Sequence, residues 1–185
     1  MRKRREKQPN TKKRASRIKL LLMDADGVLT DGRVYLQSLP DGSAQELKVF
    51  HAHDGLAVKT ARSVGLRCGV ITGRKSAALA LRAKEMDLEF VYEGQAQKIP
   101  ALDEILAKAG VRDEEVAYVG DDLPDLPIFS RVGLAIAVAN ASDEVKRAAH
   151  FVTKNCGGQG AVREVVELIL KAQGKWTDAI RNARA

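Results

Sequence analysis

The sequence predicts an α/β sandwich in which helices cover a parallel β-sheet. Short apolar runs alternate along the chain with segments expected to form helices. The first such run, Leu20–Met23, has no polar residue, as expected for a central strand buried on both faces of a parallel sheet. At 185 residues, 45% hydrophobic and only 4% aromatic, the chain is long enough for one domain with an aliphatic core.

The expected elements follow one another in regular alternation. Strands are expected at residues 20–23, 66–71, 90–92, 116–119, 134–138 and 151–152. Helices are expected at residues 56–63, 76–86, 99–109, 126–130, 142–149 and 161–173. Asp54 and Ser142 are expected to cap the first and fifth of these helices, because their side chains can accept hydrogen bonds from free amides at a helix start. This alternation predicts right-handed crossovers between parallel strands.

The segment between the first strand and the first helix is expected to be a hairpin. Residues 33–36 and 46–50 have strand character, and Pro40-Asp41-Gly42 between them has the composition of a turn. A flap over about 32–50 is too short to be a second domain.

Positive charge is concentrated at the N-terminus. Residues 1–17 contain nine Lys or Arg and one Glu, although the net charge of the whole chain is only +7. We expect a disordered basic tail over 1–17, one domain over 18–176 and a C-terminal tail over 177–185. A nucleic-acid or membrane-surface arm is the alternative, but no aromatic residue interleaves the charges as single-strand binding would favour.

The cysteine content and the apolar runs predict a cytoplasmic protein. Cys68 and Cys156 are too few for a disulfide framework and lack metal-ligand spacing. No apolar run is long enough to cross a membrane, and no secretory signal is visible.

Reactive side chains follow four of the predicted strands. Asp24 and Asp26 follow the first strand, Thr72 the second, Lys98 the third and Asp121 the fourth. Taken singly, each has an ordinary interpretation as a turn residue, a solvated lysine or an acid at a helix start. Because parallel strands end at one edge of the sheet, where open sheets bind ligands, we expect these groups to form one site.

Such a site is suited to phosphoryl transfer. Clustered carboxylates need a neutralising cation, and oxygen ligands of this kind suit Mg²⁺. Asp24 is expected to attack phosphorus and Asp26 to act as acid and base, while Thr72 and Lys98 hold the phosphate and Asp121 binds the metal.

The ordered set resembles the haloacid dehalogenase superfamily of phosphatases, from Ile18 to about Gln173. The matching motifs are Asp24-Ala25-Asp26-Gly27-Val28, Ile71-Thr72-Gly73, Lys98 and Gly120-Asp121-Asp122-Leu123-Pro124-Asp125. The resemblance implies a Rossmann-like three-layer sandwich, Mg²⁺ and an aspartyl-phosphate intermediate. It implies metal contacts from the Asp24 carboxylate, the Asp26 backbone carbonyl and Asp121. Asp125 would support the metal shell or orient Lys98, and a role for Asp122 stays open.

The chain has no room for the cap domain that most members of the superfamily carry, so the flap takes its place. The flap and the segments around the motifs resemble the phosphatases that act on 3-deoxy-D-manno-octulosonate 8-phosphate in lipopolysaccharide sugar biosynthesis. That resemblance implies a homotetramer in which a neighbouring subunit helps to close each site. The implied substrate contacts are Asp26, His51, Ala52, His53, Asp54, Gly55, Lys59, Arg74, Arg82 and Lys98.

One residue departs from that family. It commonly has Arg where this chain has His53, so a related nonulosonate 9-phosphate is the nearest alternative substrate. A non-catalytic regulatory module and a nucleic-acid end phosphatase are alternatives of other classes. The carboxylate cluster argues against the regulatory module, because a non-catalytic protein has no need of such a costly group of acids. The basic tail and the open site are the features that suggest a nucleic-acid end phosphatase.

Overall fold

Six parallel strands form the central sheet of the computed structural model, which describes residues 7–183. Their order is β5–β4–β1–β6–β7–β8, with the bounds β1 Leu20–Met23, β4 Arg67–Ile71, β5 Phe90–Tyr92, β6 Val116–Gly120, β7 Leu134–Ala137 and β8 Phe151–Val152. Central β1 has all of its residues buried and pairs Met23 with Val70 on one side and with Val119 on the other. The order of strands reverses direction between β1 and β6, the point at which open α/β sheets bind ligands.

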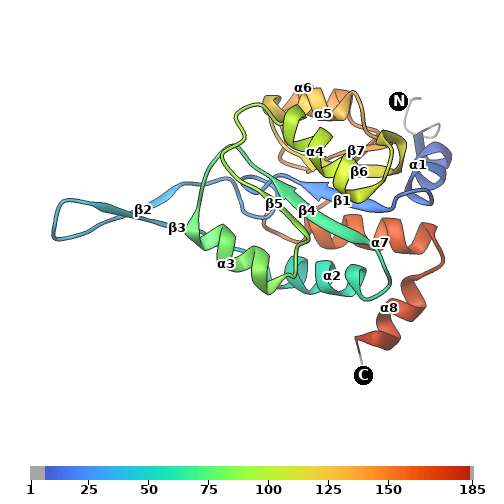
Figure 1. Cartoon of the computed structure of the whole chain (residues 1–185), viewed down its shortest axis with the longest axis horizontal. Helices are drawn as coiled ribbons and strands as arrows, with labels where there is room; N and C mark the ends of the chain where they lie inside the picture. Colours follow the sequence, from blue (N-terminus) through green and yellow to red (C-terminus); the bar gives the residue numbers. More distant parts are fainter. Residues whose placement is uncertain (1–6, 184–185) are drawn as a thin grey trace.

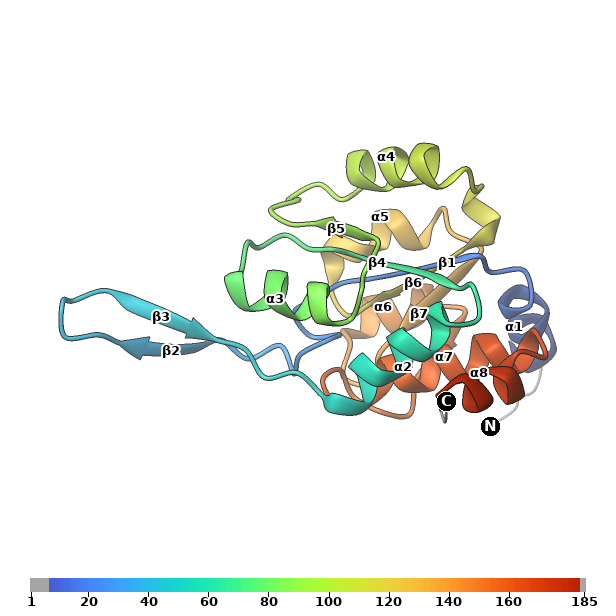
Figure 2. The same ribbon diagram turned by 60° about the horizontal axis from the view of Figure 1, so that its bottom comes forward.

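Helices cover both faces of the sheet. Helices α4 (Ile99–Ala109) and α5 (Leu126–Phe129) lie on one face, and α2 (Ala52–Arg62), α7 (Ala161–Ala172) and α8 (Trp176–Asn182) lie on the other (Figures 1 and 2). Helix α6 (Asp143–Ala148) packs beside α5, and α3 (Ala77–Glu85) lies near the base of the hairpin. The short 3₁₀ turns η1 (Asp113–Glu115) and η2 (Leu123–Asp125) precede β6 and α5. The predicted α/β sandwich is confirmed.

The predicted flap is a separate two-stranded antiparallel hairpin that projects from the body of the protein (Figure 1). It consists of β2 (Tyr35–Ser38) and β3 (Ala44–Leu47), so both strands differ in position from the expected ones. The shift arises because Ser38 pairs with Ala44 around a five-residue turn, in which Leu39 N donates to Ser43 O at 2.9 Å. The turn therefore sets the register of the hairpin.

The expectation of a disordered tail is wrong for part of residues 1–17, since Lys7–Ala15 forms helix α1. Helix α1 packs against α7, and the side chain of Ala15 is fully buried. Gln173 Nε2 donates to Ile18 O at 2.6 Å, which ties the chain after α1 to the end of α7. Tertiary packing thus orders a segment whose composition is typical of disorder. Residues 1–6 lie outside the described residues.

The C-terminal boundary also differs from the predicted one. Helix α8 extends the packed domain beyond residue 176, packs against α2 and α7, and buries Ala179 completely. Residues 184–185 of the predicted C-terminal tail lie outside the described residues.

Helix α2 begins earlier than predicted, and Asp54 does not cap it. The helix starts at Ala52, so Asp54 lies within its first turn. The Asp54 carboxylate instead accepts hydrogen bonds from Gly160 N at 3.2 Å and Arg163 N at 2.7 Å. Asp54 therefore caps the start of α7, more than a hundred residues later in the chain. Ser142 occupies the N-cap position of α6, but its hydroxyl makes no capping hydrogen bond.

Candidate active site

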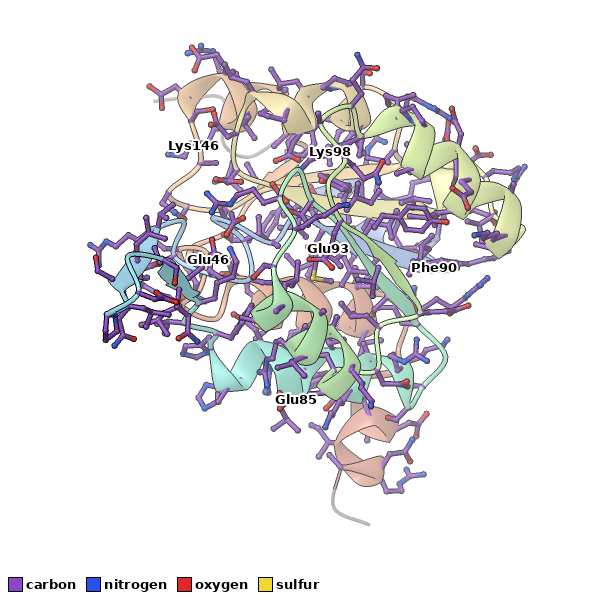
Figure 3. The ribbon with its side chains drawn as sticks, turned by 60° about the vertical axis from the view of Figure 1, so that its left-hand side comes forward. Glu46, Glu85, Phe90, Glu93, Lys98 and Lys146 are labelled. Atoms are coloured by element: carbon purple, nitrogen blue, oxygen red, sulfur yellow. The ribbon has the colours of Figure 1, made fainter. Side chains whose placement is uncertain are left out.

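The predicted reactive groups meet at the carboxyl edge of the sheet. Asp24 directly follows β1, and its amide donates to Val119 O at 2.9 Å in β6. Thr72 follows β4 and is 2% exposed. Asp121 follows β6, and Lys98 precedes α4 after β5. Lys98 is labelled in the upper part of Figure 3.

Lys98 connects two acids in the interior. Its ammonium lies 2.8 Å from Asp24 Oδ2 and 2.7 Å from Asp125 Oδ1, and only 2% of its side chain is exposed. A buried charge is costly unless it is paired and hydrogen-bonded, and here the two carboxylates supply the pairing. The charges of Asp24 and Asp125 raise the pKa of Lys98 although burial opposes them, so Lys98 stays protonated.

Asp125 contacts Lys98 directly, in agreement with one of the two roles expected for it. Its Oδ1 also accepts a hydrogen bond from the hydroxyl of Tyr118 at 2.8 Å, and its Oδ2 accepts from the amide of Asp121 at 2.9 Å. The sequence did not single out Tyr118, because alternation in a buried strand gives no sign that its hydroxyl turns toward the site. Asp122 caps η2 by accepting from Leu123 N at 2.8 Å.

Three carboxylates of this site lie close enough to hold a cation. One oxygen from each of Asp24, Asp121 and Asp125 falls within 4.8 Å of the others. Asp121 Oδ1 is buried and has no hydrogen-bond partner among the described residues. A polar atom left in this way normally binds water or an ion. The all-oxygen donor set therefore fits a hard divalent cation.

Burial changes the acidity of this cluster. Desolvation, together with the charges of Asp24 and Asp125, raises the pKa of Asp121 to about 7. Desolvation also raises the pKa of Asp24 to about 6, although Lys98 lowers it. Without a cation, the folded protein therefore keeps protons at pH values where the unfolded chain, with a carboxyl pKa of 3.8, has already released them.

This difference predicts that Asp121 destabilises the metal-free protein as the pH rises. An acid with a raised folded pKa costs stability as it ionises, here between its unfolded value of 3.8 and its folded value of about 7. Urea unfolding in the presence of a chelator should show Asp121→Asn more stable than the wild type at about pH 8. The two proteins should converge near pH 4, and a divalent cation should reduce the gap at pH 8. A gap that does not change with pH would contradict the prediction.

Two glycine-rich loops pack closely at the acidic cluster. A Cβ on Gly27 would lie 2.1 Å from Asp121 Oδ2, and Gly27 has φ +82°. A Cβ on Gly157 would lie 1.7 Å from Gly27 O, and Gly158 N donates to Val28 O at 3.0 Å. The loop after β1 therefore lies between the loop after β6 and a loop just before α7, and a side chain at Gly27 or Gly157 would separate them.

Asp26 lies beside the flap. Its Oδ1 forms an ion pair with Lys48 just beyond β3, and its Oδ2 lies 4.0 Å from Arg74 Nε. Arg74 Nη2 in turn lies 2.5 Å from Glu46 Oε1. The sequence pattern alone did not identify Glu46 or Lys48 as site residues. Their spacing of two residues within the predicted strand 46–50 was the available signal, since residues two apart in extended chain lie on one face.

A second group of predicted substrate contacts lies where α2 begins, near the base of the flap. Arg82 Nη2 donates to His51 O at 3.3 Å, and the rings of His51 and His53 meet edge to face at 5.0 Å. Gly55 makes room for Arg82, because an added Cβ would lie 2.1 Å from Arg82 Nη2. The side chains of Ala52 and Lys59 are exposed.

The expectation that Asp54 contacts substrate does not fit its position. Asp54 is only 1% exposed, and the N-terminus of α7 occupies its carboxylate. Its role in the structure is to join α2 to α7.

Comparison of the sequence with known proteins identifies the family to which this site belongs. A family of haloacid dehalogenase-like hydrolases matches residues 75–165. The 3-deoxy-D-manno-octulosonate 8-phosphate phosphatase of Salmonella typhimurium is 40% identical over 171 residues, which cover 92% of this chain and 89% of the relative.

Solved structures agree with the sequence match. The Yersinia pestis phosphatase of the same name has a TM-score of 0.87 and 41% identity, covering 91% of this chain and 89% of that chain. The Moraxella catarrhalis phosphatase, crystallised with magnesium ion, phosphate ion and a KDO molecule, has a TM-score of 0.89 and 38% identity, covering 95% and 98%. None of the helices within residues 7–183 combines the length and apolar character needed to span a bilayer. The chain is therefore a phosphoric monoester hydrolase of the haloacid dehalogenase superfamily, and it belongs to the family of the 3-deoxy-D-manno-octulosonate 8-phosphate phosphatases.

Proposed function

We propose that the protein hydrolyses 3-deoxy-D-manno-octulosonate 8-phosphate to the free sugar acid and phosphate, as a step of lipopolysaccharide sugar biosynthesis. The observation that carries this proposal is the buried contact of Lys98 with Asp24 and Asp125 beside Asp121. A relative at 38% identity whose structure contains magnesium, phosphate and KDO supports both the substrate and the metal.

Asp24 is the nucleophile of the proposed reaction. In the free protein its two oxygens are held by Ala25 N at 2.7 Å and by Lys98 at 2.8 Å, which fixes the direction of the carboxylate. Its attack forms a bond to phosphorus as the bond to the sugar oxygen breaks. Asp26 gives a proton to that oxygen, and then takes one from the water that hydrolyses the aspartyl phosphate.

The cation and the fixed positive charge stabilise the transferring phosphoryl group. Mg²⁺ held by Asp24, the Asp26 carbonyl and Asp121 would supply electrostatic stabilisation of the phosphoryl oxygens. Lys98 offers its ammonium, and Thr72 its hydroxyl, to the same oxygens. Because Asp125 and Tyr118 hold Lys98, this charge needs little reorganisation during the reaction.

The base of the flap is the proposed site of sugar-acid recognition. Arg74 and Arg82 are cations of the kind that bind carboxylates with two parallel hydrogen bonds. His53, together with His51, Ala52, Gly55 and Lys59, completes the proposed contacts. His53 gives weaker carboxylate binding near neutral pH than Arg would, which keeps a nonulosonate 9-phosphate as the alternative substrate.

The flap supports a proposed homotetramer. It and the adjoining segments expose Val34 at 56%, Leu36 at 67%, Leu47 at 47% and Val49 at 62%. A projecting hairpin with so many exposed aliphatic side chains suits contact with other copies of the chain, because an isolated two-stranded hairpin is marginally stable in water. A solution mass of about four chains would support this assembly, and a monomer at working concentration would contradict it.

The cytoplasm is the proposed location, because it keeps thiols reduced. Cys68 is a buried free thiol, and Cys156 is also free.

Phosphate release from a panel of sugar phosphates tests the proposed substrate. With Mg²⁺ present, we expect the highest kcat/KM on 3-deoxy-D-manno-octulosonate 8-phosphate and a lower value on a nonulosonate 9-phosphate. Neutral sugar phosphates, which lack the carboxylate, should be poor substrates. Equal values for neutral and acidic sugars would contradict the proposal, and chelation of the metal serves as the zero-activity control.

A further inference from the structure

Lys48 is a buried cation outside the predicted set of reactive groups. It lies directly after β3, and only 5% of its side chain is exposed. Its ammonium pairs with Asp26 Oδ1 and lies 3.8 Å from Glu46 Oε1. Removing an ammonium from water costs several kcal/mol. The two carboxylates offset this cost, so the position of Lys48 depends on them.

Asp26 is held from both sides. Lys48 binds its Oδ1, and Arg74 Nε lies 4.0 Å from its Oδ2. Glu46 joins the two cations, since it lies 2.5 Å from Arg74 Nη2 as well as beside Lys48. Lys48 and Glu46, which is labelled in Figure 3, belong to the flap region, whereas Asp26 belongs to the loop after β1. The cluster of Asp26, Glu46, Lys48 and Arg74 therefore connects the flap to the reaction centre.

We propose that Lys48 is a positioning residue that holds the Asp26 carboxyl group in the orientation needed for proton transfer. The proposal rests on the role given to Asp26 in the proposed function. Asp26 lies in a loop with 28% of its side chain exposed, and without Lys48 its carboxyl group would keep, among the described residues, only the longer contact with Arg74 at 4.0 Å. Proton transfer requires the acid within hydrogen-bonding distance of the leaving oxygen. Each of the two lysines therefore orients one acid: Lys98 orients Asp24 and Lys48 orients Asp26.

The effect of losing Lys48 should depend on the leaving group of the phosphate ester. As the phosphorus–oxygen bond of an alkyl ester breaks, the proton of Asp26 passes to the alkoxide oxygen, and Lys48 keeps its own protons throughout. A nitrophenolate leaves without needing that proton, because its ring already delocalises the charge. Loss of Lys48 should therefore slow formation of the aspartyl phosphate from alkyl phosphate esters and have little effect on its formation from p-nitrophenyl phosphate.

The test compares Lys48→Met with the wild type on both kinds of ester at saturating Mg²⁺. We expect kcat/KM on the sugar-acid phosphate to fall about 10- to 100-fold, which is part of the usual contribution of general acid catalysis. This ratio is the readout because it covers only the steps up to release of the leaving group, before Asp26 acts as a base. The kcat/KM on p-nitrophenyl phosphate should change by less than about threefold, and Lys48→Arg should recover most of the kcat/KM lost on the alkyl ester. If Lys48→Met does not fold, Lys48→Gln takes its place.

Two controls separate positioning from other roles. Lys19→Met removes a more exposed lysine–carboxylate ion pair away from the site, since Lys19 lies 2.7 Å from Glu115 before the start of β1, and it should leave both activities unchanged. The double variant Lys48→Met/Asp26→Asn should be no slower on the alkyl ester than Asp26→Asn alone, because residues acting through one another are not additive.

The proposal is overturned by an equal loss of kcat/KM on both esters, by no loss on either, or by additive losses in the double variant. Failure of the proposed function is seen separately. It would appear as a wild-type protein that does not hydrolyse 3-deoxy-D-manno-octulosonate 8-phosphate, while the comparison of leaving groups can still be made on any alkyl phosphate that it does hydrolyse.

Discussion

Asp24→Asn is expected to abolish phosphate release while the protein stays folded. The amide has nearly the shape of the carboxylate but cannot attack phosphorus, so turnover should fall by at least about 10⁴-fold. The fold should persist, since the substitution removes an acid whose pKa burial raises to about 6. Phosphate release with Mg²⁺ and the midpoint of urea unfolding measure the two effects.

Asp122→Asn is the matched control for this variant. Asp122 is a neighbouring acid that caps η2, and no described contact joins its carboxylate to Lys98. Its loss should have a much smaller effect on turnover. Substantial activity in Asp24→Asn would rule out the aspartyl-phosphate mechanism, even if the substrate were the proposed one.

Lys98→Met is expected to damage both catalysis and stability. Without the ammonium, the buried carboxylates of Asp24 and Asp125 lose their shared cation. Breaking a buried ion pair in this way costs about 3–5 kcal/mol. Turnover should fall by about 10²–10³-fold or more, because the phosphoryl oxygens lose a preorganised positive charge. Urea unfolding with a chelator and phosphate release with Mg²⁺ measure the two losses.

A second substitution separates these two effects. In Lys98→Met/Asp125→Asn one of the uncompensated charges is gone, so part of the lost stability should return. Activity should not return, because the cation that faces the phosphate is still missing. Recovery of activity in the double variant would show that Lys98 serves only to neutralise Asp125.

The sequence predicted the fold well where local pattern and tertiary environment agree. The unbroken apolar run of Leu20–Met23 requires burial on both faces, and the central place of β1 provides it. The convergence of Asp24, Thr72, Lys98 and Asp121 followed from topology, because parallel strands present their carboxyl ends at one edge.

Other features depended on distant parts of the chain. The high charge of residues 7–15 indicated disorder, but packing against α7 orders them as helix α1. Asp54 precedes the predicted helix 56–63 as a cap would, but its carboxylate accepts hydrogen bonds from the start of α7 instead. Lys48 resembles an ordinary surface lysine until the flap brings it to Asp26. In each case the partner lies too far along the sequence for a local pattern to reveal it.

The close packing of Gly157 and Gly158 against the loop that follows β1 has a consequence for biosynthesis. The loop after β1 leaves the ribosome early among the parts of this domain, yet Gly157 and Gly158, which pack against it, are made only after all six strands of the sheet. The Asp54 carboxylate likewise gains its hydrogen-bond donors, the amides of Gly160 and Arg163, only after those later residues have been made. Ribosome-bound chains that stop before residue 157 therefore lack this support for the loop after β1, and phosphatase activity should arise only after residues 157–163 have emerged.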